Sequence, residues 1–364
     1  MTLAIAPRLM LVTPRQPGAI AILQLVGQDM ASLLSGLIGR SQWSPGQMYV
    51  VDLMSVDRGL AVLLRDEVAQ IMPHGGLRVV QKLVDRLIDA GFVYDEQIDT
   101  RHLYPEADSE IEADVLACIA MASSPAAIDL LAGQPQRWRH FVQQQLITDP
   151  DLKKQVIEYS AAMDQLLYPP LVVVLGPANV GKSTLTNLMM RRSVSVVADL
   201  PGTTRDWVGG LAELGGVIDA IAVKWIDTPG FRSGGCDVEQ QAIKLAAKVI
   251  HDADVIVAML DPDHGIAQFD QMADVLLGRR KPDLWVMNKI DNGPVRGDGD
   301  DYTTPLTISA REERGIDMLQ KMIIRKLGLE QINIDIPWVF STTLKNYLSG
   351  TQPGIMQYLQ QQIE

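Results

Sequence analysis

The sequence contains few cysteines, no excess of basic residues and no long apolar run. Its 364 residues include only two cysteines, Cys118 and Cys236, which excludes a disulfide framework and a metal site made of four thiolates. No apolar run approaches the roughly 18 residues that a membrane-spanning helix needs. The first residues lack the basic leader of a secretory signal and are interrupted by Pro7 and Arg8. We therefore expect a cytoplasmic protein in a reducing compartment.

The chain is acidic. Its 32 lysines and arginines are outnumbered by 44 aspartates and glutamates, so the formal net charge is −12. Affinity for nucleic acid comes largely from basic side chains that release counterions from the phosphates. This balance excludes a broad RNA-binding surface, and any RNA contact must be local or supplied by a partner. The hydrophobic content of 47% and the length indicate a folded chain of two or three domains.

The hydrophobic pattern before residue 169 predicts two segments. Short β-prone runs, followed by an amphipathic helix that stops near Gly91, predict a small α/β domain over residues 1–108. Residues 109–168 have helical patterning, with Ser124 and Pro125 as a helix start, and predict a reduced helical domain.

The pattern after residue 168 changes to buried apolar runs separated by helical stretches. Such runs predict a mostly parallel sheet covered on both faces, within an α/β domain over residues 169–328. The runs occupy residues 171–175, 221–227, 254–261, 284–288 and 305–309. Residues 329–364 are expected to form a C-terminal helical segment.

Residues 176–183, GPANVGKS, fit the phosphate-binding pattern G-x-x-x-x-G-K-S/T between a buried run and a helical stretch. The glycines allow successive backbone N–H groups to turn toward a phosphate, and the helix N-terminus adds partial positive charge. Lys182 would bridge the β- and γ-phosphates, and Ser183 would bind Mg²⁺. The alternative is a glycine-rich strand-to-helix turn without a ligand.

Two further segments fit the phosphate side of the same site. Asp227 begins the sequence DTPG at the end of a buried run, where it would meet Mg²⁺ through a water, and the Gly230 N–H would contact the γ-phosphate. Residues 199–206, DLPGTTRD, occupy the position of a mobile switch. Thr204 is expected to be the second hydroxyl ligand of Mg²⁺, with Thr203 as the near alternative, although a plain surface loop is the other interpretation.

The sequence NKID at residues 288–291 indicates which base binds. The Asp291 carboxylate can accept two hydrogen bonds from the N1–H and N2 edge of guanine, whereas adenine would leave it unpaired. Ser309 and Ala310 would complete the base pocket through backbone contacts. We therefore expect GTP to be preferred over ATP and to be hydrolysed to GDP and phosphate. The predicted nucleotide site comprises Gly176, Asn179, Val180, Gly181, Lys182, Ser183, Thr184, Thr203, Thr204, Asp227, Gly230, Asn288, Lys289, Asp291, Ser309 and Ala310.

Together, GPANVGKST, DLPGTTRD, DTPG and NKID resemble the G domains of the TrmE, Era and Der GTPases, and PGTTRD is the most specific piece. Two segments in the first hundred residues, PGAIAILQLVG and DEVAQIMPHGG, resemble the TrmE family, also called MnmE, which modifies the wobble uridine of tRNA. The resemblance implies GTP hydrolysis helped by K⁺ held by Asn179, with Glu239 orienting water and Lys182 on the phosphates. For Asn179 and Glu239 the alternative is an exposed polar residue.

The resemblance also implies a homodimer through the N-terminal domain, transient pairing of G domains and a partner protein in tRNA modification. The chain departs from the family in three places. Gln24 replaces a strand arginine, family segments expected after Gly91 are not found, and the C-terminal cysteine motif C-x-G-K is absent. We therefore expect a shortened relative that hydrolyses GTP, is linked to or derived from tRNA wobble-uridine modification, and has lost one-carbon transfer. The departures also weigh against a folate site. A regulatory or ribosome-assembly GTPase is the alternative, although the latter should carry a basic RNA-binding module.

Overall fold

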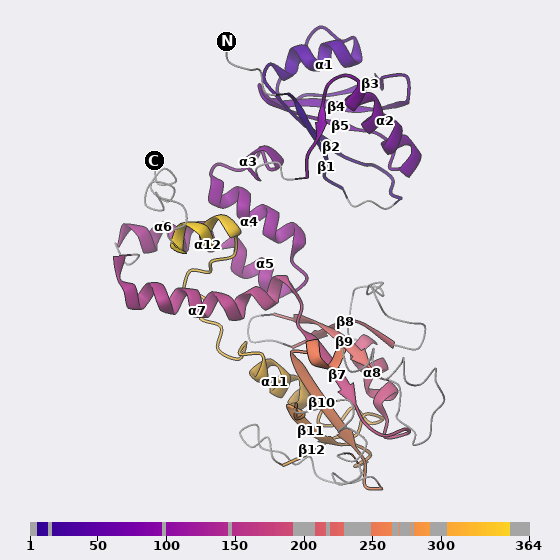
Figure 1. Cartoon of the computed structure of the whole chain (residues 1–364), viewed down its shortest axis with the longest axis vertical. Helices are drawn as coiled ribbons and strands as arrows, with labels where there is room; N and C mark the ends of the chain where they lie inside the picture. The colour runs from indigo at the N-terminus through magenta and orange to yellow at the C-terminus, as the bar shows by residue number, and fades with distance from the viewer. Residues whose placement is uncertain are drawn as a thin grey trace. The chain divides into compact units, whose positions relative to one another are not determined.

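The computed structural model describes residues 6–13, 17–96, 100–144, 148–191, 208–215, 219–228, 249–263, 269, 277, 280–291 and 304–349. The chain divides into two compact units, Met1–Ala117 and Cys118–Glu364 (Figure 1). None of the helices in these ranges is long and apolar enough to cross a membrane. The division between the units falls within helix α4 (Glu110–Met121).

The first unit is built on a six-stranded sheet with the strand order β3-β4-β5-β2-β1-β6. Its neighbouring strands are antiparallel except for the parallel pair β1 and β6. The strands are β1 (Arg8–Leu11), β2 (Leu23–Val26), β3 (Met48–Leu53), β4 (Asp57–Arg65), β5 (Val68–Met72) and β6 (Val93–Tyr94).

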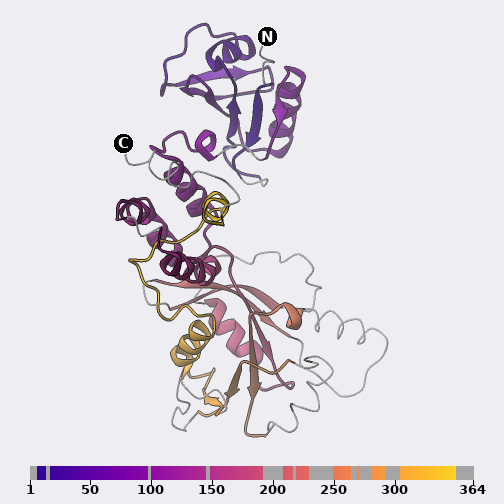
Figure 2. The ribbon, with the colours of Figure 1, turned by 60° about the vertical axis from the view of Figure 1, so that its left-hand side comes forward.

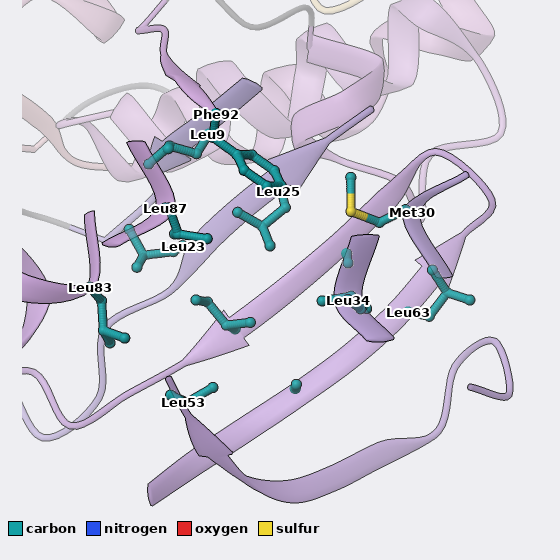
Figure 3. Close-up of a cluster of buried hydrophobic side chains, with 13 residues drawn as sticks. Leu9, Leu23, Leu25, Met30, Leu34, Leu53, Leu63, Leu83, Leu87 and Phe92 are labelled. Atoms are coloured by element: carbon teal, nitrogen blue, oxygen red, sulfur yellow. The ribbon is translucent and has the colours of Figure 1, made fainter. Parts of the chain in front are cut away.

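Helices α1 (Met30–Ile38) and α2 (Leu77–Asp89) share one buried core with this sheet. Side chains alternate between the faces of a strand, so Leu23 and Leu25 of β2 reach the core together (Figure 3). Leu83 and Leu87 of α2 meet them four residues apart on one helix face. The amphipathic helix expected in this region is confirmed, and the chain turns after it at Gly91, whose φ of 96° is the left-handed conformation that glycine adopts readily.

The region predicted to be helical is helical. Helix α3 (Thr100–Leu103) and helix α4 are followed by α5 (Pro125–Ala132), α6 (Gln134–Gln143) and α7 (Pro150–Leu167). Ser124 is the N-cap of α5, as expected, but its hydroxyl does not cap the helix. Its Oγ instead accepts a hydrogen bond from the Ala222 N–H at 3.0 Å, which ties the start of α5 to a strand of the second sheet.

The chain returns to these helices before helix α12 (Thr342–Ser349). Trp338 is buried, and its carbonyl oxygen accepts a hydrogen bond from Trp138 Nε1 at 2.9 Å. The Trp338 N–H donates to Gln134 Oε1 at 2.8 Å. On α12, Lys345 Nζ lies 2.5 Å from Asp164 Oδ2 of α7. The segment after the second sheet is therefore anchored on α6 and α7.

The second sheet has the strand order β12-β11-β10-β7-β9-β8. All neighbours are parallel except β8, which is antiparallel to β9. The strands are β7 (Leu171–Leu175), β8 (Val208–Leu214), β9 (Ile221–Asp227), β10 (Val255–Leu260), β11 (Leu284–Met287) and β12 (Leu306–Thr307). Helices α8 (Lys182–Arg191) and α11 (Ile316–Lys326) pack against this sheet (Figure 2). The predicted buried runs are confirmed as parallel strands, and the α/β fold is confirmed with them.

Candidate functional site

The predicted site residues lie where parallel strands end. The carboxyl ends of parallel strands meet at one edge of a sheet, and ligands of open α/β sheets bind at that edge. Strand β7 leads into residues 176–183, β9 ends at Asp227, β11 leads into residues 288–291, and β12 leads into Ser309 and Ala310. Strand β10 leads into Asp261, which the sequence analysis did not select.

Two glycines allow the tight turn between β7 and α8. A Cβ on Gly176 would lie 2.3 Å from the carbonyl oxygen of Met259, and one on Gly181 would lie 2.3 Å from Asn288 Nδ2. Gly181 also has a φ of 102°, which side chains rarely adopt. The N-terminus of α8 follows directly, so its unpaired N–H groups and partial positive charge suit a phosphate.

Lys182, within this turn, and Asp227, at the end of β9, are both buried. Lys182 Nζ donates to the carbonyl oxygens of Gly176 at 2.9 Å and Pro177 at 2.8 Å. Burial raises the pKa of Asp227, and the Ser183 hydroxyl and the Lys182 charge offset part of that rise. Burial lowers the pKa of Lys182, and the Asp227 charge opposes it.

The oxygens around Asp227 suit a hard cation. Ser183 Oγ donates to Asp227 Oδ2 at 2.9 Å. Asp227 Oδ1 is buried and has no hydrogen-bond partner within the described part of the chain. A buried carboxylate oxygen without a partner is costly, and Mg²⁺ prefers carboxylate, hydroxyl and water oxygens. The donor set of Asp227 and Ser183 therefore fits Mg²⁺ or a water bound to it.

Asn288 joins the two halves of the site. This buried side chain donates from Nδ2 to the Val180 carbonyl oxygen at 2.8 Å and accepts at Oδ1 from the Ala310 N–H at 2.9 Å. The phosphate-side turn and the segment after β12 are thereby held by one amide. The expected proximity of residues 176–183 to the base-reading segments follows from these bonds.

Asp291 is held at both its side chain and its backbone. Ser309 Oγ donates to Asp291 Oδ1 at 2.7 Å, and Arg314 Nη1 donates to the Asp291 carbonyl oxygen at 2.6 Å. The expectation that Ser309 contacts the base through its backbone stays a prediction, and the structure adds the contact of its side chain with the Asp291 carboxylate. Arg314 was not expected here, and no motif in the sequence pointed to it.

Asp261 is the second residue that the sequence analysis missed. Its side chain is fully buried, and Oδ2 lies 2.5 Å from Lys289 Nζ. The signal was present, because Asp261 closes the apolar run 254–261 at the same edge as the predicted site residues.

Several predicted residues stand apart from these contacts. Asn179 and Thr184 are exposed, and Asn179 has a φ of 66° within the turn. Thr203, Thr204, Gly230 and Glu239 lie outside the described residues.

Gln24, the position where the resembled family has an arginine, is fully buried on β2 in the first unit. Its Nε2 donates to the His102 carbonyl oxygen at 2.5 Å, and its Oε1 accepts from Gln70 Nε2 at 2.7 Å. Both ends of this amide therefore bond to the protein itself.

Comparisons with known proteins find similarity to GTPases. Residues 171–289 match the family described as 50S ribosome-binding GTPase. The chain is 28% identical to the tRNA modification GTPase MnmE of Nitrosomonas europaea over 87% of this chain and 80% of that protein. It is 26% identical to the MnmE of Methylococcus capsulatus over 88% and 81%. Aquifex aeolicus Era bound to GDP and aluminium fluoride is 28% identical over 45% of this chain and 57% of that chain, with a TM-score of 0.34.

The matched family segment contains the phosphate-side turn, Asp227 and Asn288, whose contacts are described above. The MnmE similarity extends beyond that segment over most of the chain. The chain is similar to MnmE over most of its length, and the domain built on its second sheet is a P-loop GTPase domain.

Proposed function

We propose that the domain binds GTP with Mg²⁺ and reads the guanine edge through Asp291. The observation that carries this proposal is the site at the carboxyl edge of the second sheet. It combines a buried lysine, a buried carboxylate oxygen without a described partner, and a carboxylate held by Ser309. The lysine would bind a phosphate, the unpartnered carboxylate oxygen would bind the cation, and the Asp291 carboxylate would bind the base.

The roles follow from the chemistry of each side chain. An ammonium group has three donors, and two of those of Lys182 bond to the turn, which leaves the third for a phosphate oxygen. Ser183 and Asp227 would hold Mg²⁺, which supplies charge neutralisation at the transferred phosphate. Asn179, exposed at the rim of the turn, would hold K⁺. Thr204, or Thr203 in its place, would add a ligand to Mg²⁺, and Glu239 would orient the water.

We further propose that this GTP cycle derives from the tRNA wobble-uridine modification system and that one-carbon transfer has been lost. The relatives are named for tRNA modification, and the similarity includes the first unit. At the position of the family's strand arginine, however, the first unit has an uncharged Gln24 whose two ends bond internally. Gln24 itself therefore offers no positive charge to an anionic cofactor such as folate.

A second candidate is full tRNA modification by this chain, which the extent of the similarity to MnmE favours. In both cases we propose that copies pair through the first unit and transiently through their GTPase domains, and that a partner protein of the modification system binds them. A regulatory GTPase that never contacts tRNA would share the GTPase domain and differ in its partners.

Complementation in cells that lack their own MnmE separates these candidates. We expect the purified protein to hydrolyse GTP and its expression to leave the modified wobble nucleoside undetected by mass spectrometry. The control is the host MnmE expressed from the same promoter, which should restore the nucleoside. Detection of the nucleoside with this chain would overturn the loss of one-carbon transfer and establish tRNA modification. Absence of GTP hydrolysis would contradict the proposal as a whole.

A further inference from the structure

We propose that Asp261 is a positioning residue for nucleobase binding. It anchors the ammonium group of Lys289, so that the aliphatic part of Lys289 forms one wall of the base slot. The inference rests on the base pocket proposed above and adds a residue that neither the phosphate-side turn nor the NKID sequence contains. The wall would raise the affinity for a purine without choosing between bases, since it offers no group to the base edge.

The geometry of Asp261 shows a carboxylate that requires a cation. Its side chain is fully buried directly after β10, and Oδ2 lies 2.5 Å from Lys289 Nζ. A buried charge is tolerated when it is paired, and removal of one partner leaves the other uncompensated. The Lys289 ammonium group is therefore paired with Asp261, while 42% of the Lys289 side chain remains exposed.

The backbone at Lys289 shows the same constraint. Lys289 has a φ of 65°, which is uncommon for a residue with a side chain and persists where surrounding structure holds it. Asn288, the residue before Lys289, is bonded to Val180 and Ala310. Asp291, two residues after Lys289, is bonded to Ser309 and Arg314. The backbone of Lys289 is thus held between two anchored residues, and Asp261 holds the ammonium end of its side chain.

A lysine fixed at both ends presents its methylene groups as a defined surface. Lysine stems cover apolar surfaces while the ammonium head stays with a polar partner. In the chain, Lys289 follows Asn288, which bonds to the phosphate-side turn, and precedes Asp291, which is assigned to the base, so a flat aromatic ring is the ligand that such a wall would fit. The distinct consequence is that Asp261 contributes to affinity for any purine ring and not to affinity for phosphate.

The experiment measures dissociation constants of GDP, inosine diphosphate and tripolyphosphate, each with Mg²⁺, for the full chain and its Asp261→Asn variant. Asparagine keeps the shape and removes the charge, so Lys289 is released without a buried unpaired carboxylate. We expect GDP and inosine diphosphate to bind about tenfold more weakly, by equal factors. Binding of tripolyphosphate, which has no base, should stay unchanged.

A double-mutant cycle completes the test. Lys289→Ala should give the same loss for both nucleotides, and the combination of Lys289→Ala with Asp261→Asn should lose no more than either change alone. Lys281→Ala, at another exposed lysine of this domain, is the matched control and should leave GDP affinity unchanged. Unchanged GDP affinity in Asp261→Asn, an equal loss for tripolyphosphate, or additive losses in the cycle would each overturn the proposal.

Failure of the underlying base pocket gives a different result. Asp291→Asn should change the ratio of GDP to inosine diphosphate affinity, because inosine lacks the N2 amino group that Asp291 would contact. If that ratio stays constant in Asp291→Asn, the assignment of the base pocket is wrong, whereas a constant ratio in Asp261→Asn is the expected result.

Discussion

At the scale of single residues, the proposed site contains charged side chains whose burial costs stability. Asp227 is 6% exposed, and its Oδ1 has no hydrogen-bond partner within the described residues. Residues held in unfavourable surroundings at a binding site commonly trade stability for function. The substitution Asp227→Asn therefore separates the effect of this carboxylate on stability from its proposed effect on Mg²⁺ and nucleotide binding.

We expect nucleotide-free Asp227→Asn to be more stable than the parent. Burial raises the folded-state pKa of Asp227 above the ordinary value of 3.8. As the pH rises above about 3.8, the unfolded chain loses this proton first, so stability falls until the pH passes the folded-state pKa. An asparagine carries no such penalty. At a pH above the folded-state pKa of Asp227, the melting temperature of the variant should therefore be about 2–4 °C higher than that of the parent.

The same variant should bind GDP with a weaker dependence on Mg²⁺ than the parent, because one of the groups proposed to hold the cation is gone. Thermal unfolding without nucleotide tests the expected gain in stability. GDP affinity measured with Mg²⁺ and with EDTA tests the expected change in Mg²⁺ dependence. Asp335→Asn, at an exposed aspartate, is the control and should change neither quantity. A lower melting temperature, or an Mg²⁺ dependence equal to that of the parent, would contradict this role of Asp227.

At the scale of elements, the turn between β7 and α8 organises the phosphate side. Gly176 and Gly181 allow it, Asn288 holds it, and Asn179 stands exposed on it. We propose that Asn179 holds K⁺, and charge stabilisation at the transferred phosphate is a large contribution to such reactions.

We expect GTP turnover to be at least about tenfold faster in KCl than in NaCl at equal ionic strength, because K⁺ at Asn179 would neutralise developing charge. Asn179→Ala should remove most of that advantage, and Arg205→Ala should not abolish turnover. Steady-state phosphate release measures each rate. Equal rates in the two salts would rule out the K⁺ mechanism. Loss of GTP turnover in Arg205→Ala, together with retained turnover in Asn179→Ala, would also rule out the K⁺ mechanism.

The parallel strands of the second sheet could be predicted because their buried runs are continuous, as in LVVVL of β7. Strand β8 was missed, since Gly209 and Gly210 interrupt its apolar pattern. The structure gives the reason for Gly209, where a Cβ would lie 2.7 Å from the Trp225 carbonyl oxygen. Close approach of a neighbouring strand is a property of the folded sheet that residue patterns do not reveal.

Residues that belong to one motif could be selected from the sequence and lie together in the structure, whereas single residues that converge from separate strands were not selected. Residues 176–183 and 288–291 were found because the spacing itself carries the chemistry. Asp261 and Arg314 act through Lys289 and Asp291, and these partners are distant in the sequence. Their roles depend on strand order, which brings the ends of β10, β11 and β12 together.

At the scale of the whole molecule, a GTPase domain is combined with a first unit that retains the similarity to MnmE. The two units differ in how well they keep the family's pattern. In the GTPase domain the described site residues converge, whereas in the first unit Gln24 is bonded internally. The nucleotide cycle is thus the activity that the chain supports most fully.

The central claim is tested most directly by calorimetric titration of the full chain with GTP and with ATP in the presence of Mg²⁺. We predict that GTP binds at least about a hundredfold more tightly, because adenine would leave the Asp291 carboxylate unpaired. Asp291→Asn should shift the preference toward xanthosine nucleotides. Equal affinity of the parent protein for GTP and ATP would contradict the account.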